Sequence, residues 1–189
     1  MCMRFVVPLA LRRKIVILID QDLLTPSQAG EEKDELFENN LKQVHKCVAW
    51  VVENVVRKNS DHIFLASIIK EDRFFEPAVL SEIFNNVLTN QDEKIDKRTI
   101  IESIFEKMAA NLSAKDVSCT AEVSSDPQIT EADIAASHKA GLIVAVPADP
   151  GLISRTLYLD WAEQLVRNGP TPTMILKGAQ LDDSLLTDF

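Results

Sequence analysis

The sequence predicts a single α/β domain built on a five-stranded parallel sheet with helices on both faces. Short, continuous apolar runs alternate along the chain with segments whose apolar residues recur every three or four positions. Such alternation of strand and helix is typical of a parallel sheet joined by crossover helices. The 189 residues suffice for one domain with a sizeable core.

The strands are read from apolar runs. The first is the clearest, because Lys14 to Asp20 is an almost unbroken β-branched run of the kind that is buried on both faces of a parallel sheet. The run from Val117 to Val123 alternates between apolar and polar residues and predicts an edge strand. All five strands are expected near residues 14–20, 63–69, 117–123, 142–146 and 173–177.

The helices are read from apolar stripes and end signals. One stripe runs from Leu41 to Val55 and another from Ile100 to Leu112. Thr130 followed by Asp133 is typical of a helix start, with Gly141 as the expected stop. A last helix is expected over residues 158–167, and polar loops over 25–35 and 91–98.

We divide the chain into an arm over residues 1–13, one domain over 14–177 and a polar, loosely attached tail over 178–189. The less regular segment over about 72–98 is interpreted as an insertion in that domain.

Composition excludes several classes of function. The net charge is −9 and the isoelectric point about 4.8, so the surface should repel nucleic acid. Three distant cysteines without a CxxC pair indicate reduced thiols in a cytoplasmic protein. No apolar run is long enough for a bilayer, and no histidine has ligand spacing, so we expect neither membrane insertion nor a metal site.

Four fragments, taken in order, resemble the universal stress protein family. They are Ile15 to Asp20, Ser125-Asp126-Pro127, Ala140 to Val144 and Pro172 to Leu176. The resemblance implies a parallel sheet in the strand order 3-2-1-4-5. It also implies a homodimer through the fifth strand, at Met174, Ile175 and Leu176.

The same resemblance locates a nucleotide site whose motif is missing. Counting without a gap, the family's two loop glycines, late glycine and hydroxyl residue fall on Val146, Asp149, Leu159 and Asp160. Glycines there let backbone N–H groups approach phosphate, and Pro147 and Pro150 remove two further donors. The chain is therefore similar to the branch of the family that lacks the glycine motif, and no ATP or other cofactor is expected.

Ligands of doubly wound sheets bind where the strand order reverses, here between the first and fourth strands. The rim of this degenerate nucleotide site should include Asp20, Gln21 and Asp22, then Pro147 to Asp149, with Asp160 nearby. Converging carboxylates suit a divalent cation or a cationic ligand. The interpretation that we favour is solvated acids at turns, where aspartate is common.

The function expected from these features is that of a regulatory or scaffold domain resembling universal stress proteins. It would act through dimerisation or protein partners, without catalysis and without ATP. The first alternative is a nucleotide-binding member with a degenerate loop and slow ATP hydrolysis. The second is a dedicated subunit of a larger assembly.

Overall fold

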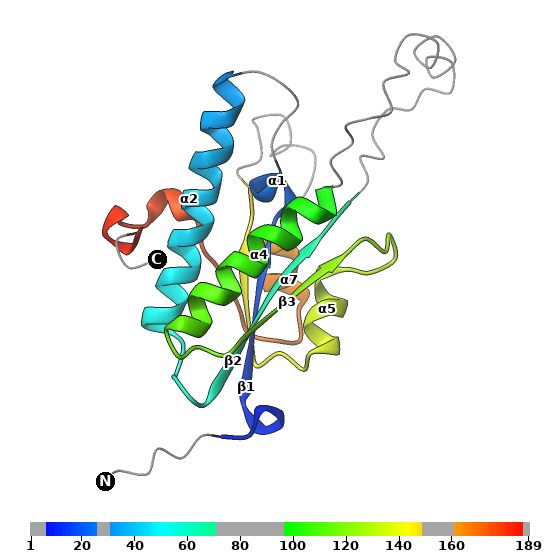
Figure 1. Ribbon diagram of the computed structural model, residues 1–189. Helices are drawn as coiled ribbons and strands as arrows, with labels where there is room; N and C mark the ends of the chain where they lie inside the picture. The colour runs from blue at the N-terminus through cyan, green and yellow to red at the C-terminus, as the bar shows by residue number, and fades with distance from the viewer. Residues whose placement is uncertain (1–6, 26–30, 71–96, 149–160, 187–189) are drawn as a thin grey trace.

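A computed structural model describes residues 7–25, 31–70, 97–148 and 161–186 (Figure 1). Five parallel strands form one sheet in the order β3-β2-β1-β4-β5, which confirms the predicted fold class and strand order. The strands are β1 (Arg13–Ile19), β2 (Asp61–Ile68), β3 (Cys119–Ser124), β4 (Leu142–Val146) and β5 (Thr173–Ile175). The edge positions of β3 and β5 are those that the sequence predicts.

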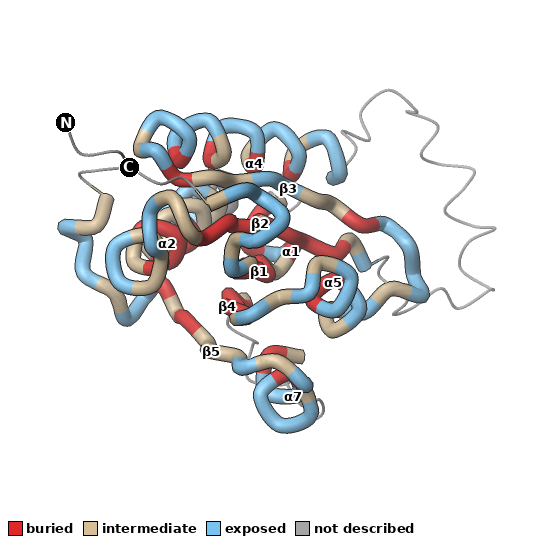
Figure 2. Tube along the Cα trace, turned by 90° about the horizontal axis from the view of Figure 1, so that it is seen from below, coloured by how far each residue is buried: buried red, intermediate tan, exposed pale blue. Residues whose placement is uncertain are grey.

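The central strand, β1, explains why the sheet is buried on both faces. Ile15 to Ile19 are all buried, and the strand pairs in register with β2 on one side and β4 on the other. Ile15, Ile17 and Ile19 join one apolar cluster, and Val16 and Leu18 join a second cluster on the opposite face. Figure 2 shows this buried strip through the middle of the molecule.

Helices cover the two faces. The helices α2 (Glu31–Asn54) and α4 (Lys97–Ala114) bury stripes that include Val44, Val48 and Phe105 in the larger cluster. On the other face, α5 (Glu131–Ser137) contributes Ile134, and α7 (Trp161–Asn168) contributes Leu165. A short helix, α1 (Gln21–Leu24), follows β1 directly, and 3-10 turns occupy Leu9–Leu11, Gly178–Gln180 and Asp183–Leu186. Among the described residues, no helix is long and apolar enough to cross a membrane.

Helix ends differ from the prediction where apolar periodicity gives no signal. The predicted loop over 25–35 is wrong for residues 31–35, because α2 begins at Glu31, ahead of its first apolar contacts. The loop over 91–98 is likewise wrong at Lys97 and Arg98, which belong to α4. The rest of the proposed insertion, residues 72–96, lies outside the described residues.

Of the two predicted ends of α5, the start is correct and the stop is wrong. Its start is confirmed, because Thr130 and Asp133 form a reciprocal capping box. Its predicted stop at Gly141 is wrong: the helix ends at Ser137, and the left-handed residue is Lys139, with φ 52°.

The start of β1 is held to β2 by an ion pair. The Arg13 guanidinium donates to both carboxylate oxygens of Asp61, at 3.1 and 2.6 Å. Asp61 is buried, and its carboxylate also accepts the backbone N–H of Arg57 at 2.8 Å. The sequence gives no sign of this pair, because the two residues are far apart along the chain.

The tail is attached more firmly than its composition predicts. Residues 178–186 pack along α2, where Lys46 contacts the carboxylate of Asp183 and the backbone oxygen of Leu181. Gly178 lies so close to α2 that a Cβ atom there would come within 2.6 Å of the Cα of Gln43. The described part of the tail therefore packs on the fold and lies beside α2 (Figure 1).

Candidate functional site

The predicted crevice between the first and fourth strands centres on Asp20. This residue follows β1, and its backbone N–H donates to the carbonyl of Val146 at the end of β4, at 3.0 Å. Its carboxylate caps α1 by accepting the N–H of Asp22 at 3.2 Å. Asp20 therefore stands where the strand order reverses, the place at which doubly wound sheets bind ligands.

The chain's own side chains already occupy part of this crevice. The indole Nε1 of Trp161, at the first position of α7, donates to the Asp20 carboxylate at 3.1 Å. The N–H of Ala148 approaches the same oxygen at 3.4 Å. A contact across 141 positions of sequence thus joins the start of α7 to the end of β1.

Gln21 ties α1 to the end of β2. Its side chain is buried, donates to the carbonyl of Lys70 at 3.2 Å and accepts the N–H of Lys70 at 3.0 Å. Both ends of the amide are paired, as buried polar groups require. Gln21 therefore has a structural role in the wall of the crevice.

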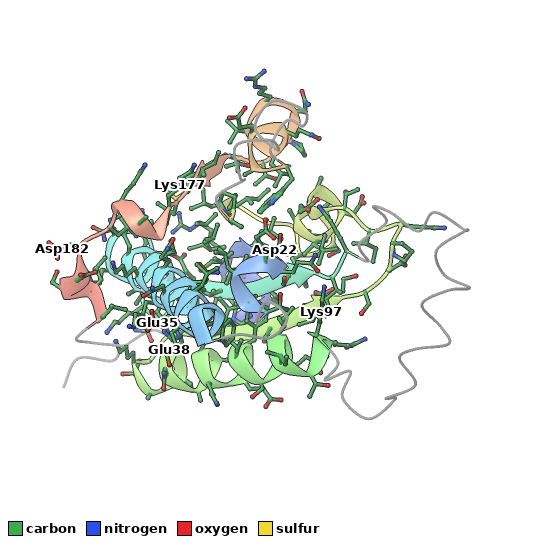
Figure 3. The ribbon with its side chains drawn as sticks, turned by 90° about the horizontal axis from the view of Figure 1, so that it is seen from above. Asp22, Glu35, Glu38, Lys97, Lys177 and Asp182 are labelled. Atoms are coloured by element: carbon green, nitrogen blue, oxygen red, sulfur yellow. The ribbon has the colours of Figure 1, made fainter. Side chains whose placement is uncertain are left out.

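A cavity of about 170 Å³ lies beside Asp20. The charged side chains in its wall are Asp20, Asp22, Lys70 and Glu131, and the Lys70 ammonium pairs with Glu131 at 2.5 Å. Figure 3 views this end of the sheet from above and shows Asp22 on α1. The wall is completed by Leu18, Ile19, Gln21, Ser67, Ile68 and Trp161.

Ser67 is among the residues that line this cavity, but its hydroxyl is itself buried in the fold. Ser67 is 1% exposed, and its Oγ has no hydrogen-bond partner among the described residues. A buried hydroxyl without a partner is costly, so such groups are uncommon in native folds. No sequence signal marks Ser67, since its neighbours form no hydrolase motif.

The structure brings together only part of the predicted rim. Asp20, Gln21 and Asp22 line the cavity, and Pro147 and Ala148 follow β4 directly. Val146 is the last residue of β4 and is buried in the larger core cluster, away from the cavity wall. The positions of Asp149, Leu159 and Asp160 lie outside the described residues.

Sequence reasoning missed Ser67, Lys70, Glu131 and the polar role of Trp161. The apolar neighbours of Trp161 predict core packing, and the indole does pack against the smaller apolar cluster. Its contact with Asp20 could not be predicted, because it depends on how α7 is placed against β1.

The histidines lie apart from this cavity. His62 is buried on β2, where its ring nitrogens lie 2.7 Å from the Ser118 hydroxyl and 3.1 Å from the Thr120 hydroxyl. Burial lowers the pKa of His62, and the positive charges of Arg12 and Lys14 lower it further. The ring therefore stays neutral near pH 7 and serves the fold, as the sequence predicts.

The described cysteines have no catalytic features. Burial raises the pKa of Cys47 and that of Cys119 to about 12, so both thiols stay protonated at neutral pH. Neither forms a disulfide. Among the described residues, no group of three or more potential ligand side chains is placed to hold a metal ion.

The fold defines a doubly wound α/β protein. Asp20 lies at the point where its strand order reverses, which is where folds of this class bind ligands. The chain's sequence matches no family model and no curated protein. Its structure is similar to that of a universal stress protein family protein from Arabidopsis thaliana solved with AMP bound. The TM-score is 0.51 at 13% identity, over 87% of this chain and 91% of that one.

Other solved structures of the same kind align with it. The universal stress protein UspA from Lactobacillus plantarum gives a TM-score of 0.45 at 14% identity, over 87% of this chain and 99% of that one. A family member from Burkholderia pseudomallei gives 0.41 at 12% identity, over 90% and 99%. The similarity to the Arabidopsis structure, at a TM-score of 0.51, shows that the chain has a universal stress protein-like fold, as the fragments of its sequence predict.

Proposed function

We propose that the chain is a cytoplasmic, non-enzymatic regulatory or scaffold domain that does not bind ATP at its switch point. It acts through a second copy of itself or another protein partner. The observation that carries this proposal is the hydrogen bond from the Trp161 indole to the Asp20 carboxylate. Through this bond, a side chain of the chain itself occupies the acid at the point where the strand order reverses.

Two further features support the absence of ATP. Pro147, directly after β4, has no N–H to offer a phosphate. The excess of carboxylates over ammonium groups in the wall opposes a polyanion.

The Arabidopsis structure with AMP is the observation that favours the alternative, a nucleotide site with a degenerate loop. At 13% identity the likeness is one of fold and not of site. The residues matched to the family's glycines, Val146, Asp149 and Leu159, cannot bring several backbone N–H groups close to phosphate in the way that glycines do.

Calorimetry with ATP and magnesium at low millimolar concentration should give no saturable heat. Each lost hydrogen bond to a charged phosphate costs roughly 1.5–3 kcal/mol. Since a tenfold change in affinity is about 1.4 kcal/mol, losing two or three turns micromolar binding into millimolar or weaker. A micromolar dissociation constant that is lost in Asp20→Asn would contradict the proposal.

Magnesium needs its own control, because the ion could join a phosphate to a carboxylate of the rim. The titration is therefore repeated with a chelator. Binding that occurs only with the metal would favour the nucleotide-binding alternative.

For the partner, we propose a homodimer through β5. The strand order places β5 at the edge of the sheet, where Met174 and Ile175 are partly exposed. The N–H of Leu176 donates to Ala145 in β4, so the N–H of Ile175 points the other way, to the open edge. Unpaired edge groups of this kind invite pairing with another strand.

Replacing Ile175 with proline should convert the dimer to a monomer in sedimentation experiments without unfolding the domain. Proline removes the outward N–H and is tolerated on edge strands. The matched control, Ile175→Ala, shortens the same side chain but keeps the N–H, and it should remain dimeric. Wild-type protein that sediments as a monomer at high concentration would count against this interface.

A further inference from the structure

The amino ends of the parallel strands meet at one edge of the sheet, opposite the crevice described above. The segments that lead into β1, β2 and β4 contact one another there. The N–H of Val7 donates to the carbonyl of Asn59 at 3.2 Å, and the N–H of Gly141 donates to the carbonyl of Lys14 at 2.8 Å. These segments therefore form one continuous surface, the amino-edge surface, made of residues 7–14, 57–60 and 138–141.

The amino-edge surface is basic, although the net charge of the protein is −9. None of its three segments contains an acidic residue, and its Arg13 is paired with Asp61 of β2. The adjoining acids, Glu53 and Asp116, are accompanied by Lys115 and are fewer than the cations of the surface. Besides Arg13, those cations are Arg12, Lys14, Arg57, Lys58 and Lys139.

Two exposed leucines lie at the tip of this surface. Leu9 and Leu11 belong to the 3-10 turn before β1, and their exposed fractions are 53% and 75%. Among the described residues, the other exposed large apolar side chains are Leu36 on α2 and Val166 on α7, each by itself. Figure 1 shows the turn before β1, in blue, projecting from the end of the sheet. A single exposed leucine needs no explanation, but two on one projecting turn beside five cations form a combined apolar and basic surface.

The charge and shape of this surface select its partner. A positive surface favours an anionic partner. Leucines on a projecting turn can enter the boundary between the headgroups and the acyl chains of a bilayer. A protein partner would need a hollow that fits the turn, and the phosphates of a nucleic acid would gain nothing from the leucines. An anionic membrane is the partner that uses both the charges and the leucines.

We propose that the amino-edge surface binds the face of an anionic phospholipid membrane. Leu9 and Leu11 enter the headgroup boundary, and the surrounding cations lie on the anionic headgroups. This is binding at the membrane surface and not the insertion that the sequence argues against; no helix among the described residues is long and apolar enough to span a bilayer. The inference goes beyond the proposed function, because it gives the regulatory domain a place of action.

The acids at the other edge of the sheet are too distant to cancel this attraction. Asp20 and Asp22 follow the carboxyl end of β1, whereas the amino-edge surface includes the start of the same strand. The seven residues of β1 span roughly 23 Å at about 3.3 Å per residue. The Debye length at physiological ionic strength is about 8 Å, so charges at that separation are largely screened.

The experiment measures how much of the full chain floats with lipid vesicles. Vesicles of phosphatidylcholine with phosphatidylserine should bind the protein at least about tenfold more tightly than phosphatidylcholine alone, because each cation near an anionic surface strengthens binding about fivefold. Equal binding to the two kinds of vesicle, or no binding to the anionic ones, would overturn the proposal. Binding to polyglutamate without binding to vesicles would also overturn it and would assign the surface to an acidic protein.

A double variant, Leu9→Ser with Leu11→Ser, tests the apolar contact. It should weaken binding to the anionic vesicles about tenfold, because the exposed parts of both leucines no longer leave water. The matched control is Leu36→Ser, since Leu36 is 54% exposed and lies near the start of α2, whose other end leads to the amino-edge surface. This control should bind as the wild type does. If the double variant bound equally well, the turn would not enter the bilayer and the proposal would fail.

A second double variant, Lys58→Gln with Lys139→Gln, tests the charges. Both side chains are exposed, so the thermal midpoint should stay unchanged while binding to the anionic vesicles falls about tenfold or more. The control, Lys42→Gln with Lys107→Gln, makes the same change of net charge at exposed positions within α2 and α4. It should leave binding intact. Equal binding by these two lysine double variants would overturn the proposal, because the position of the cations would then not matter.

Discussion

Replacing Arg13 with methionine should lower the free energy of unfolding by about 3 kcal/mol. The substitution leaves the Asp61 carboxylate buried, with the backbone N–H of Arg57 still donating to it. Removing one member of a buried pair is costly because the other charge stays without compensation. The Arg13 side chain is 40% exposed, which places the loss at the lower end of the usual range of about 3–5 kcal/mol.

Urea unfolding measures this loss, with Arg167→Met as the matched control. Arg167 pairs with Glu163 at 3.6 Å on the surface of α7, where both side chains are more than half exposed. Such a pair contributes less than about 1 kcal/mol. The double variant Arg13→Met with Asp61→Asn should lose less than the sum of the single changes, because no uncompensated charge remains. If Arg13→Met and Arg167→Met lowered the free energy of unfolding by similar amounts, the pair of Arg13 with Asp61 would contribute no more than a surface pair.

Replacing Gly178 with alanine should destabilise the protein by about 1–3 kcal/mol. The added Cβ would lie 2.6 Å from the Cα of Gln43, which is backbone of α2 and cannot move aside as a flexible side chain can. The tail would have to shift away from α2. The contacts at risk are the packing of Leu181 on the core and the pairing of Lys46 with Asp183.

Gly141→Ala is the control, because its Cβ would meet mainly the flexible Cγ of Arg13, at 3.1 Å. It should change stability by less than about 1 kcal/mol. Hydrogen exchange gives a second measurement: the amide of Leu181, which donates to Gly178, should lose protection in Gly178→Ala before the sheet does. Equal stability of Gly178→Ala and Gly141→Ala would contradict the conclusion that the close packing of Gly178 on α2 stabilises the protein.

The elements that sequence reasoning located best are those whose local pattern and final environment agree. The apolar run of β4 has the predicted bounds, Leu142 to Val146, because every one of its residues is needed in the core between β1 and β5. The capping box at Thr130 and Asp133 was equally readable, since both partners lie within one helical turn.

The errors fall where local pattern carries no information. The first turns of α2 are polar, so a stripe that begins at Leu41 could not show that the helix starts at Glu31. After α5, Lys139 takes a left-handed conformation, whereas the sequence predicts Gly141 as the stop of this helix. The attachment of the tail depends on the close approach of Gly178 to α2, which composition cannot reveal.

By itself, the sequence determined the fold class, the strand order implied by its family resemblance, and the acids that follow β1. Only the tertiary structure decided what surrounds those acids: the Trp161 indole on Asp20, the pairing of Lys70 with Glu131 and the pairing of Gln21 with the backbone of Lys70. The physical reason is separation along the chain. Periodicity and capping act over a few residues, whereas these contacts join β1, β2, α5 and α7, whose positions are set by packing on the two faces of the sheet.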